Sequence, residues 1–229
     1  MKKLIYVMVI LSSLQQYAQT QKGIQNGIFE HLKTNAIILT DEGIIRGSSK
    51  VKKFTSSFIE SNYNKDFSIE VNSTLEYEIG EIETNSEKYT VMFLKAKEAN
   101  SVPKIEFLTI YNNSKSELDT SAIDNSRQKW MTLCNSHFAD KLVKQLYMPQ
   151  VYYYNRGRLI QGTKALTTEY SYMNMPSYSL KLSPKHIVSV NSEIVYEIGQ
   201  CSGSYPFPYM LVWKKQEDGK WLILMDSNY

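Results

Sequence analysis

The sequence has little of what marks several protein classes. Two cysteines, six prolines and ten glycines among 229 residues exclude a disulfide-dense scaffold, a collagen and a long low-complexity linker. Three histidines at unrelated spacings form no metal-ligand pattern, so we expect no metal and no cofactor. A net charge of only +3 makes no electrostatic case for binding nucleic acid. What is present, 42% hydrophobic and 21% charged residues, is typical of one large or two small folded domains.

The first eighteen residues have the pattern of a secretory signal peptide. A cationic start, Met1-Lys2-Lys3, precedes an apolar stretch over residues 4–14 and a polar stretch that ends at Ala18. The apolar stretch is about half of the roughly 20 residues that span a bilayer, so we expect no stable membrane anchor. The sequence therefore predicts an exported protein, periplasmic or extracellular, cleaved near Ala18. In such a compartment Cys134 and Cys201 could form one disulfide or remain two buried thiols.

Three sequence blocks occur twice in the same order. Residues 75–80 (LEYEIG) recur as residues 194–199 (IVYEIG), shifted by 119, and the same shift carries residues 92–95 onto residues 211–214. Residues 43–47 resemble residues 157–162, shifted by 114 to 115. We interpret the chain as two copies of one unit, over residues 22–118 and 119–229, that meet in the polar run 112–125.

The second copy predicts helices followed by strands. Apolar residues recur at helical spacing over residues 130–146, as one helix or as two that break at Asn135-Ser136. A strand over residues 151–154, a turn over 157–162 and a short helix over 163–173 follow. Strands over residues 185–190, 194–200, 208–214 and 220–226 complete the unit, with a hairpin turn at Asp218-Gly219. This order predicts an α+β fold in which helices pack in a strongly curved antiparallel sheet.

These residues resemble a SnoaL-like or ketosteroid-isomerase-like domain of the nuclear transport factor two-like superfamily. The most specific part is an apolar strand with Trp213 and Lys214, the Asp218-Gly219 turn, and Trp221-Leu222-Ile223. The resemblance covers residues 120–229 well and residues 30–112 less well. It implies two cone-shaped units with an apolar cavity, the first with a shortened or missing opening helix. Members include isomerases, dehydratases, cyclases and domains with no known reaction, so the fold does not decide the function.

The resemblance implies a carboxylate base at the end of the first strand of a catalytic unit. In the second copy the nearest match is Asn155, which cannot accept a proton at neutral pH. In the first copy Asp41 or Glu42 could serve, unless both are solvated turn residues. His137 is a further catalytic candidate as a general base, although it could equally be a surface residue at a helix break. Asp226 is another, because burial in a cavity would raise the pKa of its carboxylate, although its position near the C-terminus could instead leave it exposed.

Tyrosine is the most unusual component, because seven of the 17 lie between residues 147 and 178. Phenol rings suit an aromatic, sterol-like or sugar ligand through stacking and hydrogen bonds, although they could also simply complete a half-buried sheet. Arg156 and Arg158 flank Gly157 and could recognise an anion or remain solvated. The expected ligand-binding residues of the C-terminal cavity are Trp130, Tyr152, Tyr154, Tyr170, Tyr196, Trp213 and Asp226.

Three functions remain open from the sequence. The chain could bind a small apolar or aromatic ligand without transforming it. It could be an enzyme of isomerase, dehydratase or cyclase type. It could also be an interaction module, in which the two copies pack as an intrachain pseudo-dimer.

Overall fold

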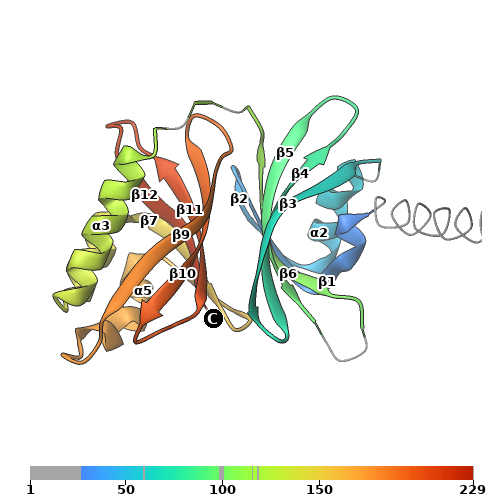
Figure 1. The fold of residues 1–229 in the computed structure, drawn as a ribbon. Coiled ribbons are helices and arrows are strands. Elements are labelled where there is room, and N and C mark those ends of the chain that lie inside the picture. Colours follow the sequence, from blue (N-terminus) through green and yellow to red (C-terminus); the bar gives the residue numbers. More distant parts are fainter. Residues whose placement is uncertain (1–26, 59, 98–100, 115, 118, 229) are drawn as a thin grey trace, which may run out of the picture.

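The computed structural model describes residues 27–58, 60–97, 101–114, 116–117 and 119–228, arranged as two six-stranded sheets (Figure 1). The predicted signal peptide over residues 1–18 lies outside these residues. Within them, every helix is too short or too polar to cross a membrane.

The first unit begins with a single turn of 3-10 helix, η1 (Ile28–His31). Its strands form the order β2-β1-β6-β5-β4-β3. The elements are β1 (Leu32–Thr40), β2 (Gly43–Ile45), α2 (Ser48–Thr55), η2 (Ser56–Phe58), β3 (Asn62–Asn72), β4 (Leu75–Glu83), β5 (Lys88–Ala96) and β6 (Lys104–Asn112).

The second unit repeats this order with two additional helices in front. Its strand order is β8-β7-β12-β11-β10-β9, which is the first order with each strand replaced by its repeat counterpart. The elements are α3 (Ser121–Asn135), α4 (Ala139–Leu146), β7 (Tyr147–Asn155), β8 (Arg158–Gln161), α5 (Thr163–Glu169), η3 (Tyr170–Asn174), β9 (Leu180–Ser189), β10 (Ile194–Gly203), β11 (Pro208–Lys215) and β12 (Trp221–Asn228).

The predicted α+β fold of two cone-like units is confirmed, with two differences in the strands. The sheets are not wholly antiparallel, because β1 pairs parallel with β6 and β7 pairs parallel with β12. The predicted turn over residues 157–162 contains a strand, β8, which forms a hairpin with β7. The predicted helix break is present, since α3 ends at Asn135 and His137 has a φ of 61°.

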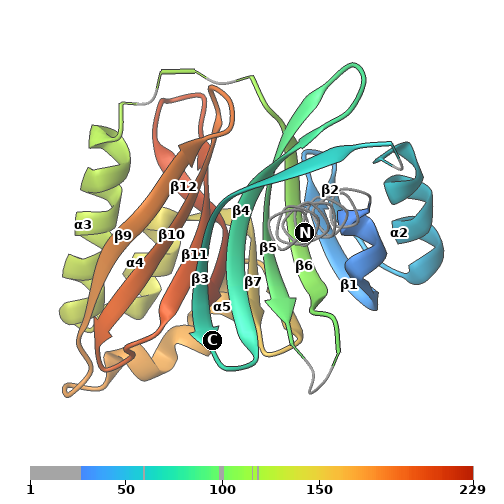
Figure 2. The same cartoon turned by 45° about the vertical axis from the view of Figure 1, so that its right-hand side comes forward.

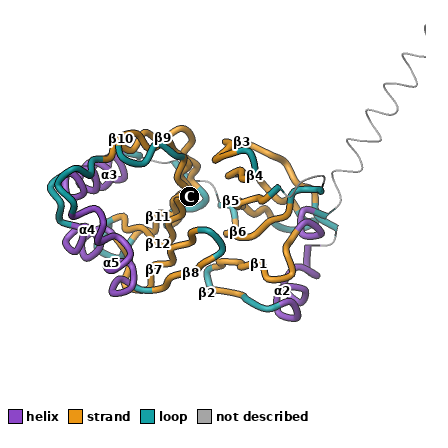
Figure 3. Tube along the Cα trace, turned by 90° about the horizontal axis from the view of Figure 1, so that it is seen from below, coloured by secondary structure: helices purple, strands orange, loops and turns teal. Residues whose placement is uncertain are grey.

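The two sheets pack face to face, and the helices lie on their outer sides (Figures 1 and 2). Seen from below, the strands occupy the middle and the helices the two flanks (Figure 3). One buried cluster contains side chains from both units, including Tyr77 and Tyr111 from the first and Tyr196 from the second. Helices α3, α4 and α5 cover the other face of the second sheet. Burial on both faces explains why all five residues of the run 209–213 are apolar or aromatic.

Equivalent tyrosines of the two units reach across the contact in opposite directions. The Tyr77 hydroxyl lies 3.2 Å from Ser227 Oγ in the second unit. The Tyr196 hydroxyl donates to the Thr90 carbonyl of the first unit at 3.3 Å. Tyr77 and Tyr196 occupy the same position of the repeated block, so equivalent positions of the two sheets contact the opposite unit.

The strand register corrects one of the three repeat alignments. Met92 pairs with Ile79, whereas Met210 pairs with Ile198, so β5 and β11 correspond at a shift of 118 residues and not 119. A slip of one residue exchanges the two faces of a strand. With the corrected register, Met92 and Met210 both face the opposite unit.

Candidate functional site

One row of paired residues crosses the second sheet and carries two carboxylates. Glu197 pairs with Leu211, Leu211 with Asp226, and Asp226 with Tyr153. Residues directly opposite one another in a sheet project to the same face. In this row that face is the concave one under the helices, where Leu211 and Tyr153 belong to the interior cluster. With one strand between them, the Glu197 and Asp226 backbones lie about 10 Å apart.

Asp226 is buried and held by two phenols. Tyr147 donates to Asp226 Oδ2 at 2.7 Å, and Tyr170 donates to the same oxygen at 2.6 Å. Trp130 Nε1 in turn donates to the Tyr147 hydroxyl at 2.9 Å. Burial raises the pKa of Asp226 to about 6, although the hydrogen bonds from Tyr170 and Tyr147 act in the opposite direction. Asp226 is therefore a carboxyl group that can exchange a proton near neutral pH.

Glu197 is buried in a second polar cluster. Arg127 of α3 binds it with two parallel hydrogen bonds, from Nε to Oε1 and from Nη2 to Oε2, both 2.8 Å long. Tyr209 donates to Oε1 at 2.6 Å, and Trp213 Nε1 donates to Oε2 at 2.8 Å. Burial would lower the pKa of Arg127, but its bonds to Glu197 outweigh this and raise it. With four donors already bound, this glutamate holds α3 on the sheet and is not available to a substrate.

The interior of the second cone is filled by its own side chains. The enclosed space beside Asp226 has a volume of about 10 Å³, bordered by Trp130, Leu211 and Asn228 among others. A single water molecule needs about this much space. Among the described residues, the space beside Asp226 is therefore too small for an apolar ligand of the kind expected from the sequence.

An open pocket lies at the mouth of the same cone. It has a volume of about 540 Å³ and shares Asn228 with the small interior space beside Asp226. Its lining joins the β7–β8 hairpin, the end of α5, η3 and the loop before β11. The lining residues are Tyr153, Asn155, Arg156, Arg158, Glu169, Tyr172, Tyr178, Tyr205 and Asn228.

Hydrogen bonds hold most of the polar groups of this lining in place, but the Tyr205 hydroxyl has none among the described residues. Asn155 Nδ2 donates to the Tyr153 hydroxyl at 2.8 Å, and Tyr153 donates to Asn228 Oδ1 at 2.6 Å. Arg158 Nη2 pairs with Glu169 Oε2 at 2.6 Å. The hydroxyl of Tyr205 is buried and has no hydrogen-bond partner among the described residues. Burying a phenol without a partner is unfavourable, so this hydroxyl is a local cost in the pocket wall.

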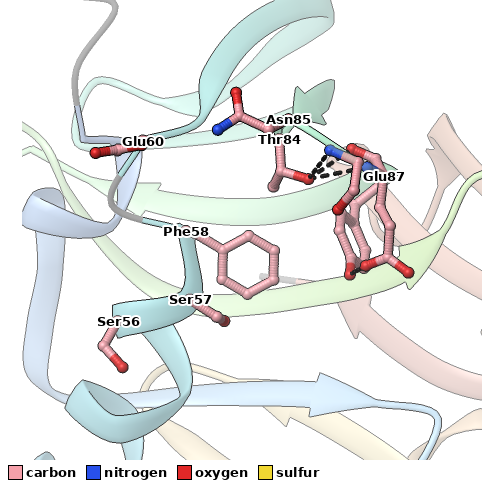
Figure 4. Close-up of a pocket in the computed structure, with 9 residues that line it drawn as sticks. Ser56, Ser57, Phe58, Glu60, Thr84, Asn85 and Glu87 are labelled. Carbon is pink, nitrogen blue, oxygen red and sulfur yellow. Dashed lines mark hydrogen bonds between the residues drawn. The ribbon is translucent and has the colours of Figure 1, made fainter.

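The first unit has a pocket of similar size with a different character (Figure 4). It has a volume of about 580 Å³ and lies between η2 and the β4–β5 hairpin, with Phe58 turned towards it. Hydroxyl groups of this pocket bind backbone carbonyls close to them in the chain. Ser57 Oγ donates to the Phe54 carbonyl at 2.8 Å, and Thr84 Oγ1 donates to the Glu87 carbonyl at 3.0 Å. These bonds end a helix and close a turn, which accounts for the polar residues without a ligand.

The predicted ligand-binding residues separate onto two faces of the second sheet. Trp130, Tyr170, Trp213 and Asp226 lie inside the cone or line its small cavity. Tyr152, Tyr154 and Tyr196 lie on the opposite face, in the cluster shared with the first unit. Tyr154, for example, packs on Phe107 with ring centroids 5.1 Å apart. These three tyrosines therefore contact the other copy and not the cone interior.

The other catalytic candidates do not meet Asp226. His137 is half-buried in the corner between α3 and α4, with Nδ1 at 3.2 Å from the Met173 carbonyl. Asp41 is exposed in the turn between β1 and β2, as is Glu42. Asn155 lies at the end of β7 and lines the mouth pocket.

Sequence reasoning missed Arg127, Tyr147 and the role of Glu197. A glutamate in the repeated block at the same position as Glu78 was a usable signal, because a charge retained within an apolar strand needs a partner. Arg127 lies on the apolar face of α3, one turn before Trp130, and is buried. That spacing could have identified it as the partner.

The described residues offer no evident site for metal or thiol chemistry. Among the described residues, no group of three or more His, Cys, Asp or Glu side chains could hold a metal ion. Cys134 and Cys201 are both free and buried. Burial raises the pKa of the Cys134 thiol to about 12, so it stays protonated and unreactive.

Comparison with known proteins gives structural neighbours only. No family model and no curated protein matches the sequence. An NTF-2-like protein of unknown function from Shewanella oneidensis MR-1 is 19% identical, with a TM-score of 0.42, over 48% of this chain and 98% of its own. A candidate ketosteroid isomerase from Shewanella frigidimarina is 21% identical, with a TM-score of 0.38, over 47% of this chain and 94% of its own.

A domain of unknown function with a cystatin-like fold, from Nostoc punctiforme, is 16% identical, with a TM-score of 0.42, over 50% of this chain and 78% of its own. Each of these structures covers about half of this chain, and their names agree with the resemblance expected from the sequence. At these identities the similarity concerns the fold of one half and not its activity.

Proposed function

We propose that this chain is a binding protein that takes up a small, polar, ring-containing ligand at the mouth of its second cone and does not transform it. The observation that carries the proposal is the contrast in volume, about 540 Å³ at the mouth against about 10 Å³ beside Asp226. Pockets of a few hundred Å³ with aromatic walls and a few fixed polar groups are typical ligand sites.

The tyrosines of the mouth support a ring-containing ligand. Tyr172 lies with its ring centroid 5.3 Å from that of Tyr178, at an interplanar angle of 71°, so the two rings present different surfaces to the pocket. Tyrosine combines a large apolar area with a polar hydroxyl and loses little entropy on binding. These tyrosines differ from the ones that the sequence predicted as ligand-binding residues, none of which lines the mouth pocket.

A ligand screen by thermal shift tests this proposal. We expect some compounds of a library of monosaccharides, cyclic polyols and aromatic acids to raise the melting temperature of the wild type. Tyr172→Ala should abolish that rise. Tyr89→Ala is the matched control, because Tyr89 is a half-exposed tyrosine that lines the other pocket, and it should keep the rise. A library without any Tyr172-dependent compound contradicts the proposal.

Enzymatic proton transfer is a second candidate, favoured by Asp226 alone. A carboxyl group with a pKa of about 6 and two phenol donors has the properties of a general acid or base. Access would require Asn228 to move, because it lines both the mouth pocket and the small space beside Asp226. Turnover of a substrate identified by the screen, lost in Asp226→Asn while binding persists, would favour the enzyme over the binding protein.

We further propose that the chain is exported and that its two sheets act as an intrachain pseudo-dimer. The amino-terminal pattern of residues 1–18 supports export, and the shared cluster of Tyr77, Tyr111 and Tyr196 supports the pseudo-dimer. Sequencing the N-terminus of the protein secreted by its native host tests cleavage near Ala18. Small-angle scattering with two separated lobes would contradict the pseudo-dimer.

A further inference from the structure

Exposed apolar side chains gather at one end of the second unit. Among the described residues five large hydrophobic side chains are exposed, and four of them belong to this end. Phe138 lies in the corner between α3 and α4, Met175 follows η3, and Phe207 lies between β10 and β11. Tyr172 of η3 is the fourth. Single apolar residues are normal on a protein surface, but a gathered set marks an interaction surface.

Hydrogen bonds hold these three segments side by side. Ala139 N donates to Asn174 Oδ1 at 3.0 Å, which joins the α3–α4 corner to the end of η3. Ser179 N donates to Ser204 Oγ at 2.9 Å, which joins the segment after η3 to the β10–β11 loop. The segments therefore present one surface, the apolar tip, made of Phe138, Tyr172, Met175 and Phe207.

Tyrosine rings connect the apolar tip to the rim of the mouth pocket. The ring centroid of Tyr172 lies 5.3 Å from that of Tyr178, and the centroid of Phe207 lies 5.0 Å from that of Tyr205. The three tyrosines line the mouth pocket, whereas Phe207 does not. The tip therefore begins at the rim of the pocket and extends beyond it.

The charged side chains at the apolar tip are mainly positive. Lys141 is exposed, and its Nζ lies 4.0 Å from the centroid of the Phe138 ring. Lys181 is also exposed, and it pairs with Ser202 at the end of β10. Asp140 is the only carboxylate in the described segments 136–141, 170–181 and 202–208, which form the tip. The tip is therefore complementary to a partner that combines an apolar interior with negative charge.

A lipid bilayer fits this surface better than a second copy of the chain. Two copies that docked through the same tip would bring the lysines of both to one interface, where like charges repel. At a bilayer, phenylalanine and methionine enter the edge of the hydrocarbon, tyrosines lie at the level of the headgroups, and lysines remain in water beside the phosphates. Anionic lipids attract each lysine further.

We propose that the apolar tip docks the chain on an anionic lipid bilayer, with Phe138, Met175 and Phe207 inserted at the boundary between headgroups and acyl chains and with Lys141 and Lys181 beside the phosphates. The inference goes beyond the proposed function and does not depend on it, because none of the three inserted side chains lines the mouth pocket. Insertion of a few side chains makes this docking peripheral and reversible.

Sedimentation with lipid vesicles tests the docking surface. Vesicles of phosphatidylcholine alone are compared with vesicles of equal parts of phosphatidylcholine and phosphatidylglycerol. We expect the wild type to bind the anionic vesicles more tightly, and added salt to weaken that binding. The triple variant Phe138→Gln, Met175→Gln, Phe207→Gln should bind about a hundredfold more weakly, because three apolar side chains no longer leave water. All variants keep the wild-type amino terminus, so any contribution of the apolar residues 4–14 is the same in each.

The matched control is Val102→Gln. Val102 is 59% exposed, more than any side chain of the apolar tip, and it precedes β6 in the first unit. This variant should bind vesicles like the wild type. The double variant Lys141→Gln, Lys181→Gln should weaken binding to anionic vesicles about tenfold and leave binding to phosphatidylcholine unchanged. Because all replaced side chains are exposed, the melting temperatures should equal that of the wild type, which verifies that each variant is folded.

Several outcomes would overturn the inference. Equal vesicle binding by the wild type and the triple variant would exclude the apolar tip as the docking surface, and equal binding by the lysine variant would exclude the preference for anionic lipid. A dimer seen by light scattering without lipid, and lost in the triple variant, would assign the tip to a second copy. Capture of a soluble protein through the tip without vesicle binding would assign it to a protein partner.

Failure of this inference can be distinguished from failure of the proposed function. If the wild type binds no vesicles but a library compound raises its melting temperature in a Tyr172-dependent way, the membrane surface is wrong and the proposed function stands. If vesicles bind through the tip and no compound binds, the proposed function is wrong and the membrane surface stands.

Discussion

The two halves of the molecule bury a glutamate at the same position of the repeat but neutralise it by different routes. In the second half, Arg127 of α3 donates hydrogen bonds to Glu197, and Trp213 of the neighbouring strand donates another. In the first half the cation comes from the sheet itself, because Lys95 Nζ donates to Glu78 Oε2 at 2.7 Å. Lys95 and Trp213 occupy equivalent positions in the corrected register.

The difference follows from the opening helices. Among the residues that the structure describes before β1, only η1 is helical, so nothing there corresponds to α3. A buried carboxylate must be paired, and the half without a described counterpart of α3 places a lysine where its counterpart has tryptophan. The comparison shows that the repeated glutamate is a structural constraint that each half satisfies with the elements it has.

The same comparison explains why a glycine lies two residues after the glutamate in both copies, at Gly80 and Gly199. A Cβ atom on Gly199 would lie 2.3 Å from the Tyr209 ring, and one on Gly80 would lie 2.4 Å from the Tyr63 ring. Each tyrosine ring packs over the glycine, and its hydroxyl donates a hydrogen bond to the glutamate two residues before that glycine. Tyr209 comes from β11 and Tyr63 from β3, so the two rings arrive from opposite sides.

Asp226 has no counterpart in the first half. The row that contains Glu197, Leu211 and Asp226 corresponds to one with Glu78, Phe93 and Leu108. Among the described residues, the first half therefore has leucine at the position where the second half has a buried carboxyl with a raised pKa. This asymmetry is the reason for proposing a binding site in the second copy.

The largest effect is expected from removing the cation above each glutamate. Arg127→Met should lower the free energy of unfolding by about 3–5 kcal/mol, since it leaves Glu197 charged and buried. Lys95→Met should cost less, about 1–3 kcal/mol, because the Lys95 side chain is 21% exposed and water can replace it. Denaturant titration measures both. A double variant, Arg127→Met with Glu197→Gln, should recover part of the loss, and equal costs in the two halves would contradict this account.

The pH dependence of stability should come from Asp226 in the second half. Its pKa lies near 3.8 when unfolded and rises to about 6 when folded, so the folded state binds the proton more tightly. The resulting stabilisation is complete below pH 4 and is lost as the pH rises through 6, by about 3 kcal/mol. Unfolding curves for wild type and Asp226→Asn between pH 4 and 7 should diverge accordingly. Parallel curves would exclude a raised pKa.

The two glycine variants should differ in how they can be rescued. Gly199→Ala and Gly80→Ala should each cost about 1–3 kcal/mol through overpacking. The close contacts of Gly199 are all with the Tyr209 side chain, so adding Tyr209→Leu should make its cost smaller. Gly80 also meets the Asn64 carbonyl at 2.5 Å, and adding Tyr63→Leu should relieve it less. Double-mutant cycles of unfolding free energy measure this, and equal rescue would be inconsistent with the backbone contact.

The smallest effect is expected at the exposed edge of the contact between the halves. His186 Nε2 lies 2.8 Å from Asp66 Oδ2, and the His186 ring stacks on Phe67 at 4.8 Å. Asp66→Asn should change the unfolding free energy by less than about 1 kcal/mol, because both side chains are partly solvated. The effect should shrink further at high salt. A loss as large as that of Arg127→Met would mean that the edge, and not the apolar cluster, holds the halves together.

Much of the fold was accessible from local patterns. The helix break at Asn135 and the Asp218-Gly219 turn depend on residues close together in the chain, and the repeat is visible by comparing short blocks; each is present in the structure. The strand β8 was missed because four residues between two glycines look like a turn. The alternation of Tyr152, Tyr153 and Tyr154 predicted two faces, but not which face meets the other copy.

The site was less accessible because its groups come from distant elements. Asp226 was a candidate, yet its partners Tyr147 and Tyr170 lie 79 and 56 residues away. The mouth pocket gathers residues from β7 to the last residue of β12, and no local spacing brings these together. Volume is a property of packing, so the filled interior could not be read from composition.

The sequence by itself determined the duplication and the α+β order of the second unit, because these depend on repeated blocks and on the periodicity of apolar residues. Tertiary structure alone decided which sheet faces meet, which cation reaches each glutamate and where space remains for a ligand. Contacts between distant strands and helices set these, and a shift of one residue in register is enough to reverse them.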